Sequence, residues 1–139
     1  MKLWSTRIFL AIAGLLLLAI GGSIVFAPHS FYAGNGITLG DDPNLLSEIR
    51  APGGLLAASG LLILLGAFRA GMRSRAMALA VLVYGSFGIA RLVSMAFDGL
   101  PASGVIAATV IELVVAMVGL ALLPRSDDRG RAPAAVEAV

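Results

Sequence analysis

Apolar residues dominate four stretches of the chain, at about residues 8–26, 52–68, 76–97 and 105–123. A helix needs about 20 mostly apolar residues to cross a hydrocarbon core that is about 30 Å thick. Each stretch is close to that length, and turn-forming residues separate it from the next one. The pattern predicts an all-α membrane protein whose residues 1–124 form a four-helix transmembrane bundle.

The first apolar stretch has a second interpretation, because Lys2 and Arg7 precede it in the way that basic residues precede a signal peptide's apolar part. That part of a signal peptide spans about 7–15 residues, and this stretch is longer. Val25-Phe26-Ala27 resembles a cleavage site only loosely. We therefore expect a retained helix.

The connections between the stretches differ in composition. Residues 29–44 are rich in Gly and Asp, residues 69–75 are basic, and residues 99–104 contain Pro101. The tail, residues 125–139, combines charges of both signs with Ala and Pro, which predicts a disordered segment.

Basic residues near the membrane predict the orientation of the chain. They fall before the first helix, between the second and third, and after the fourth: Lys2, Arg7, Arg69, Arg73, Arg75, Arg125, Arg129 and Arg131. All three segments lie on the same side of a four-helix bundle. The positive-inside rule therefore predicts that both termini are cytoplasmic and that the first and third connections face outward.

Composition narrows the possible functions. Of 139 residues, 59% are hydrophobic and 13% are charged, with a mean hydropathy of +0.97, whereas a soluble domain has about 25% charged residues. The four helices account for most of the chain, which leaves no room for a soluble catalytic domain. The basic residues behind the net charge of +2 lie mainly in the short segments that flank the helices, so a nucleic-acid-binding surface is disfavoured. The absence of Cys excludes disulfides, thiolate metal sites and Cys nucleophiles.

Small residues recur at helical spacing in three of the predicted helices. They are Gly14 and Gly21 in the first, Gly53, Ala57 and Gly60 in the second, and Ala108 and Ala116, on either side of Glu112, in the fourth. Helices in lipid associate through close approach at small side chains. We interpret these stripes as packing surfaces rather than ligand contacts.

Three ionisable residues, Arg91, Asp98 and Glu112, fall within or beside the apolar stretches. A charge at the centre of a membrane helix costs about 2.5–3.5 kcal/mol on insertion scales, so such residues usually face the bundle interior and find partners. On the third helix, offsets of three and four place one polar stripe together: Tyr84, Gly88, Arg91, Ser94, Met95 and Asp98.

Arg91 and Glu112 each lie about 10 Å from the outer end of their helices, at 1.5 Å per residue. Because a short connection makes the third and fourth helices antiparallel neighbours, we predict an Arg91–Glu112 ion pair. Such a pair can hold helices in register without any other role.

The entry to the second helix adds polar residues at the same depth. If Asp42 is the N-cap and Pro43 the first helical residue, Pro52 lies inside the helix and leaves the carbonyl of Glu48 without its usual donor. Arg50 or a ligand could supply that donor. We therefore predict a polar, ligand-binding pocket in the outer half of the bundle, lined by Glu48, Arg50, Tyr84, Arg91, Ser94, Asp98 and Glu112.

No metal or cofactor follows from the sequence. His29 lies beside Pro28 in a connection and is interpreted as a loop or interfacial residue, and helix capping accounts for Asp41 and Asp42. The chain contains no calcium loop, phosphate loop, dinucleotide fingerprint or paired-His motif.

Several motifs resemble those of a bacterial family of small membrane proteins, catalogued as domain of unknown function 4345. They are Asn-Leu-Leu-Ser-Glu-Ile-Arg-Ala-Pro-Gly-Gly at residues 44–54, Gly-Ile-Ala-Arg-Leu-Val-Ser at 88–94, Asp-Gly-Leu-Pro at 98–101, and Glu112. The resemblance covers about residues 3–123. It implies a four-helix protein of the bacterial inner membrane, without an assigned reaction. A more distant likeness to DoxX-like membrane proteins, in size and topology, suggests association with redox or quinone-linked systems.

Competing functions stay open at this level. A binding or accessory protein would hold a membrane lipid or small amphiphile in the polar pocket, alone, as a homo-oligomer or with another membrane protein. An intramembrane isomerase or lipid-modifying enzyme would use Glu112 or Asp98 as acid and base, although the sequence favours a protein without catalysis. A third alternative is a purely structural role, which the Gly and Ala stripes support. A channel or transporter is disfavoured because the chain has no inverted repeats.

Overall fold

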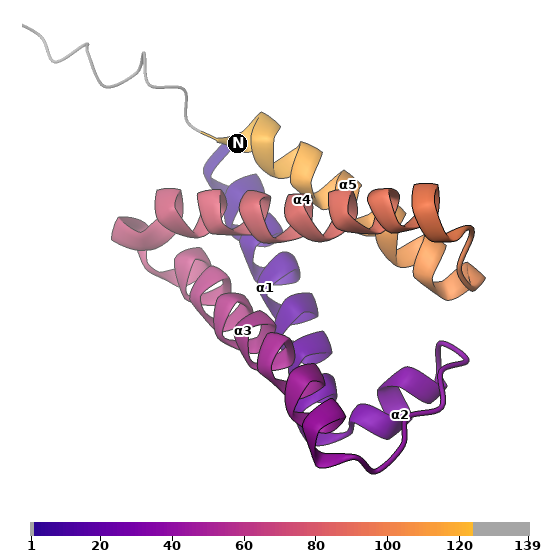
Figure 1. Ribbon diagram of the computed structural model, residues 1–139. Helices are drawn as coiled ribbons and strands as arrows, with labels where there is room; N and C mark the ends of the chain where they lie inside the picture. Colours follow the sequence, from indigo (N-terminus) through magenta and orange to yellow (C-terminus); the bar gives the residue numbers. More distant parts are fainter. Residues whose placement is uncertain (1, 124–139) are drawn as a thin grey trace, which may run out of the picture.

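The computed structural model describes residues 2–123 and consists of helices, four of which are long and apolar enough to cross a membrane (Figure 1). These are α1 (Lys2–Phe26), α3 (Pro43–Phe68), α4 (Arg73–Asp98) and α5 (Ser103–Leu122). A short helix, α2 (Pro28–Ala33), follows α1, and a single 3₁₀ turn, η1 (Ala70–Met72), precedes α4. The predicted fold class, an all-α membrane protein with a four-helix bundle, is confirmed, and the predicted disordered tail at residues 125–139 lies outside the described residues.

All four long helices start before their apolar stretches, and two of them start well before. α3 begins at Pro43 rather than near Pro52, and α1 begins at Lys2 rather than near Ile8. At α3 the cause is local, because the Asp42 side chain accepts a hydrogen bond from the Asn44 backbone N–H at 2.9 Å. Pro43 occupies the first turn, where its missing N–H has no consequence. Capping residues therefore extend the helix beyond its apolar part.

The long helices form two closely packed pairs, α1 with α3 and α4 with α5 (Figure 1). The pairs meet near the start of α1 and the end of α5, which we call the terminal end. They diverge toward the opposite end, where α2 lies, which we call the α2 end. The core residues Leu10, Ile63 and Met77 are fully buried where the pairs meet.

Glycines allow α1 and α3 to approach backbone to backbone, as their predicted packing role requires. A Cβ atom added at Gly14 would lie 2.6 Å from the backbone nitrogen of Leu64, and one at Gly21 would lie 2.6 Å from the carbonyl oxygen of Gly53. Gly60 lies equally close to Leu18 of α1. The small-residue stripes of the first two helices are therefore an interhelical contact surface.

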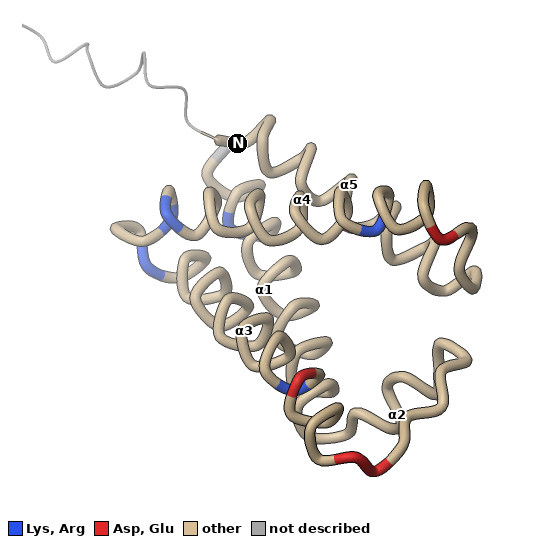
Figure 2. Tube along the Cα trace, in the orientation of Figure 1, with Lys and Arg blue, Asp and Glu red and all other residues tan. Residues whose placement is uncertain are grey.

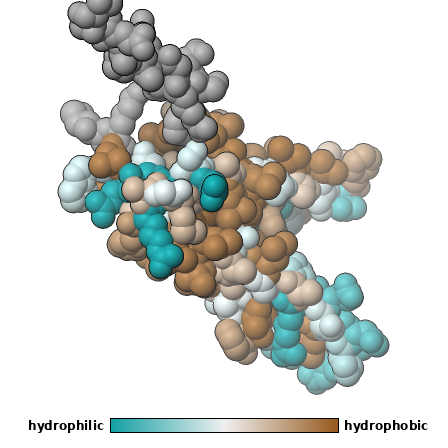
Figure 3. All heavy atoms as spheres, turned by 90° about the vertical axis from the view of Figure 1, so that its left-hand side faces the viewer, coloured by the Kyte–Doolittle hydropathy of each residue, from teal (hydrophilic) through white to brown (hydrophobic). Residues whose placement is uncertain are grey.

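The surface has the character of a multi-pass membrane protein. Figure 3 views the molecule from the side of the connection between α3 and α4. Hydrophilic residues gather at that connection and again at the bottom of the view, and hydrophobic residues lie between them. Large apolar side chains are exposed on all four long helices, among them Leu15, Leu55, Leu82 and Met117. Lipid is the environment that stabilises such surfaces.

Candidate functional site

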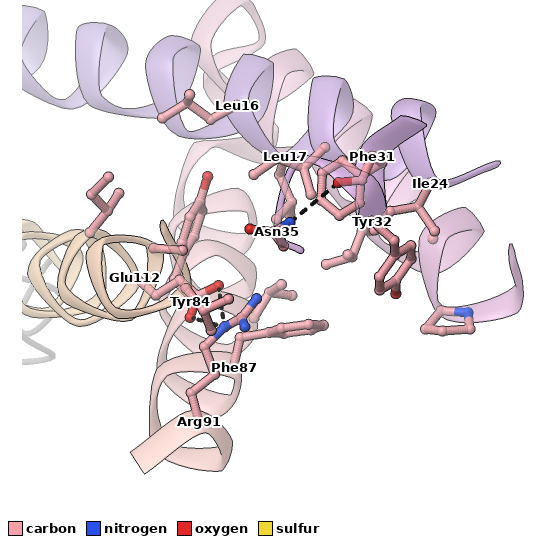
Figure 4. A pocket seen from close by; sticks show the side chains of 18 of the residues that line it. Leu16, Leu17, Ile24, Phe31, Tyr32, Asn35, Tyr84, Phe87, Arg91 and Glu112 are labelled. Carbon is pink, nitrogen blue, oxygen red and sulfur yellow. Dashed lines mark hydrogen bonds and ion pairs between the residues drawn. The ribbon is translucent and has the colours of Figure 1, made fainter. Parts of the chain in front are cut away.

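A cavity of about 460 Å³ lies where the two helix pairs diverge. We call it the central cavity, and all four long helices and the α2 segment contribute to its wall (Figure 4). Aliphatic and aromatic side chains make up most of the lining: Leu16, Leu17, Ile20, Ile24, Phe31, Ile37, Ile49, Leu56, Val83, Phe87, Val105 and Ile111. The polar members are Tyr32, Asn35, Tyr84, Arg91 and Glu112.

Arg91 and Glu112 form the predicted ion pair. The Nε–H of Arg91 donates to both carboxylate oxygens of Glu112, at 3.2 and 3.0 Å. The two side chains are 35% and 14% exposed, respectively, so Glu112 lies deeper than its partner. The prediction from helix depth and antiparallel pairing is confirmed.

A glycine positions this pair. Gly88 lies one helical turn from Arg91, and a Cβ atom there would lie 2.7 Å from Cδ2 of Leu113, the neighbour of Glu112 in sequence. The absence of a side chain at Gly88 thus lets α4 and α5 approach beside the pair. This closeness allows the short Glu112 side chain to reach Arg91 across the helix interface.

Tyr84 lines the cavity from α4 and also connects the two helix pairs. Its side chain is buried, and its hydroxyl donates to the carbonyl oxygen of Ala13 in α1 at 2.6 Å. A helix carbonyl that already accepts a backbone bond can accept a second one through its remaining lone pair. Tyr84 therefore fixes the distance between α4 and α1 at the inner end of the cavity.

The α2 segment closes part of the cavity at the α2 end. Phe31 and Tyr32 pack edge to face, with ring centroids 5.4 Å apart, and both line the cavity. Asn35 donates to the carbonyl of Phe31 at 3.3 Å, and its side-chain oxygen lies close to Gly104 at the start of α5. These residues were not among the predicted site residues, although the adjacent aromatic side chains in a polar connection were a usable signal.

The other predicted site residues lie elsewhere. Ser94 donates to Asp98 at 3.0 Å on an exposed part of α4, and neither residue lines the cavity. Glu48 is exposed on α3. Arg50 donates through Nε to the carbonyl of Val25 at 3.1 Å, so it joins α3 to the end of α1 rather than serving the Glu48 carbonyl.

The structure therefore brings together Tyr84, Arg91 and Glu112 of the predicted pocket and leaves Glu48, Arg50, Ser94 and Asp98 outside it. The three that line the cavity come from facing positions on α4 and α5. Of the other four, Glu48 and Arg50 lie near the start of α3, and Ser94 and Asp98 lie near the end of α4. Ligand binding by any of them stays a prediction.

His29 has a partner that the sequence did not indicate. Its Nε2 atom lies 3.2 Å from Oδ1 of Asp41, and both side chains are substantially exposed. The contact joins α2 to the residues immediately before α3. Within residues 2–123, no group of three or more His, Asp or Glu side chains is arranged to hold a metal ion.

The chain matches a known protein family. The family model described as a domain of unknown function, DUF4345, matches residues 5–123. The chain belongs to this family. The match covers the whole central cavity and the four long helices apart from the first three residues of α1. No curated protein or solved structure matches the chain.

Proposed function

We propose that this multi-pass membrane protein binds a small amphiphile, such as a membrane lipid, in the central cavity. The observation that carries the proposal is a large, mainly apolar cavity with one ion pair in its wall. Ligand sites in proteins commonly have volumes of about 300–1,000 Å³, with apolar linings and a few polar groups that orient the ligand. The central cavity has this composition.

The amphiphile would lie with its apolar part along the aliphatic wall and its polar part beside Arg91. Arg91 has five N–H donors, and the described residues engage only the one on Nε. In Figure 4 the guanidinium extends from α4 toward the cavity. Its terminal nitrogens are thus available to a ligand oxygen.

We further propose that the cavity lies in the outer half of a bacterial inner membrane, with both termini in the cytoplasm. Figure 2 supports this orientation, because basic residues gather near the connection between α3 and α4 and acidic residues gather at the α2 end. Basic connections favour the cytoplasmic side. The cavity lies toward the acidic end.

A variant that fills the cavity tests the proposal. Ala108 lines the cavity, whereas its neighbour Ala107 is exposed outside it. We expect native mass spectrometry of gently purified protein to find a co-purifying amphiphile in the wild type and in Ala107→Trp. Ala108→Trp should lose at least ten-fold of it. Equal retention by both variants, or no bound species in the wild type, would overturn the proposal.

A structural role for the ion pair is the alternative that a specific observation favours. Arg91 and Glu112 join α4 to α5, and buried pairs can hold helices in register without binding anything. Under that alternative, Arg91→Gln would destabilise the bundle. Ala108→Trp would have no effect on any bound species. Acid–base catalysis would depend on Glu112, since Asp98 does not line the cavity.

A further inference from the structure

The exposed part of the cavity wall shows where the cavity opens. Five lining residues are classed as exposed: Leu16, Ile20, Ile37, Pro52 and Ile111. None of them has a polar side chain, and four are branched aliphatic residues that are 38–52% exposed. An opening that faced water would place an apolar rim against solvent at a cost proportional to its area. This rim suits contact with hydrocarbon.

Two of the rim residues come from α1 and one from α5, and these helices diverge beside the cavity. At the terminal end they touch, where a Cβ atom on Gly119 would lie 3.2 Å from Cζ of Phe9. Toward the α2 end they separate (Figure 1). Leu16 and Ile20 of α1 and Ile111 of α5 are exposed and belong to the cavity wall, so the cavity reaches the surface between these two helices.

The charged groups in the cavity wall restrict the polar part of a ligand. Among the lining residues only Arg91 and Glu112 carry full charges, and they neutralise each other. An anionic head group would meet the Glu112 carboxylate beside Arg91, and would lose its hydration on entry. An uncharged head group is not repelled by the carboxylate and loses much less hydration free energy on entry. Because the terminal nitrogens of Arg91 are donors only, such a head group must offer acceptor oxygens.

We infer that the central cavity takes an uncharged lipid with acceptor oxygens, which enters from the bilayer through the gap between α1 and α5. The inference rests on the proposed function and adds the ligand class and the route. The acyl chains lie against the aliphatic wall and extend through the gap, and ester or hydroxyl oxygens accept hydrogen bonds from Arg91.

Two probes with the same chains test the ligand class. Dioctanoylglycerol is uncharged and carries ester oxygens, and dioctanoylphosphatidic acid adds an anionic phosphate to the same skeleton. With purified full-length protein in neutral detergent, we expect native mass spectrometry to give at least ten-fold tighter binding of dioctanoylglycerol. Glu112→Gln leaves the Arg91 charge unpaired and should reduce or reverse this preference. The double variant Arg91→Gln, Glu112→Gln should bind both probes weakly.

The outcomes separate this inference from the proposed function. If neither probe binds saturably to the wild type, or if Ala108→Trp leaves binding unchanged, binding in the cavity fails and the inference fails with it. If the anionic probe binds as tightly as the uncharged one, and Ala108→Trp abolishes both, the proposed function stands and the ligand class is wrong.

Exchange of lipid in nanodiscs tests the route. Ile111 lies at the rim, whereas its neighbour Val110 is similarly exposed, at 56% against 52%, and does not line the cavity. Leu16 and Leu15 form a second such pair. We expect Ile111→Trp and Leu16→Trp to slow exchange of bound dioctanoylglycerol for its deuterated form at least five-fold. Val110→Trp and Leu15→Trp should exchange at the wild-type rate, and equal rates in all four variants would overturn the lateral route.

Discussion

At the scale of single residues, Arg91 and Glu112 bring two charged groups, which the membrane interior disfavours, into direct contact. Each charge alone would be costly at this depth, and the pair lowers that cost by hydrogen bonds from one Nε–H to two carboxylate oxygens. The same geometry leaves the outer part of the guanidinium unused. One residue thus contributes both to the stability of α4 against α5 and to the polarity of the cavity.

Removing either partner should therefore cost more than removing both. We expect Arg91→Gln and Glu112→Gln each to lower the free energy of unfolding by about 2 kcal/mol. The double variant should lose less than either single variant, because no unpaired charge remains. Thermal unfolding in detergent, followed by circular dichroism, measures the cycle. Additive losses would contradict direct coupling between the two side chains.

The two tyrosines of the cavity should respond differently to loss of their hydroxyl groups. The Tyr84 hydroxyl donates to Ala13, whereas the Tyr32 hydroxyl has no hydrogen-bond partner among the described residues. We expect Tyr84→Phe to destabilise the protein by about 0.5–1.5 kcal/mol and Tyr32→Phe to leave stability nearly unchanged. The same thermal measurement checks both, and equal effects would contradict a specific role for the bond to α1.

At the scale of helices, close contact between α1 and α3 depends on which face each glycine occupies. Gly21 faces the backbone of α3, and its neighbour Gly22 has nothing within 4 Å of an added Cβ atom. Gly53 and Gly54 of α3 show the same contrast. Pairs of adjacent glycines therefore contain one residue that packing requires and one that it does not.

This contrast predicts opposite outcomes for adjacent substitutions. Gly21→Ala must force α1 and α3 apart, and overpacking of this kind costs about 1–3 kcal/mol. Gly22→Ala should leave stability unchanged or raise it slightly, because alanine favours a helix. Thermal unfolding of the two variants side by side tests the assignment. A larger loss for Gly22→Ala would show that the helix face is wrong.

At the scale of the whole molecule, divergence of the two helix pairs creates the cavity. Contacts at the terminal end are close, since Gly66 lies against Ala76 and Arg7 donates to the carbonyl of Ala67 at 3.1 Å. At the α2 end, the segment between α1 and α3 occupies part of the space between the pairs. The chain is thus dense at one end and hollow at the other.

The orientation of this asymmetric molecule can be measured directly, because the chain has no Cys. Gly40 and Gly71 lie in connections at opposite ends, and an added Cβ atom meets nothing within 4 Å at either position. In intact cells we expect an impermeant maleimide to label Gly40→Cys and not Gly71→Cys. After permeabilisation both should react. Labelling of Gly71→Cys alone in intact cells would reverse the proposed topology.

Features that depend on local composition and on distance along a helix could be predicted from the sequence. Runs of apolar residues predicted four spanning helices, and helical depth predicted the Arg91–Glu112 contact. These predictions succeeded because helix geometry converts residue number into height in the membrane. Height alone, however, does not say which side chains face one another.

Which polar residues share the cavity depends on how the two helix pairs are arranged in space. Glu48 and Arg50 lie on α3, in the other helix pair, and Ser94 and Asp98 lie on an exposed part of α4 beyond Arg91. Similar height therefore did not bring these four side chains into the cavity. Phe31, Tyr32 and Asn35 line the cavity because the α2 segment lies against the space between the two helix pairs. The angle between the pairs follows from side-chain packing at the terminal end, which involves residues far apart in sequence. That angle sets the volume of the cavity and the position of its opening.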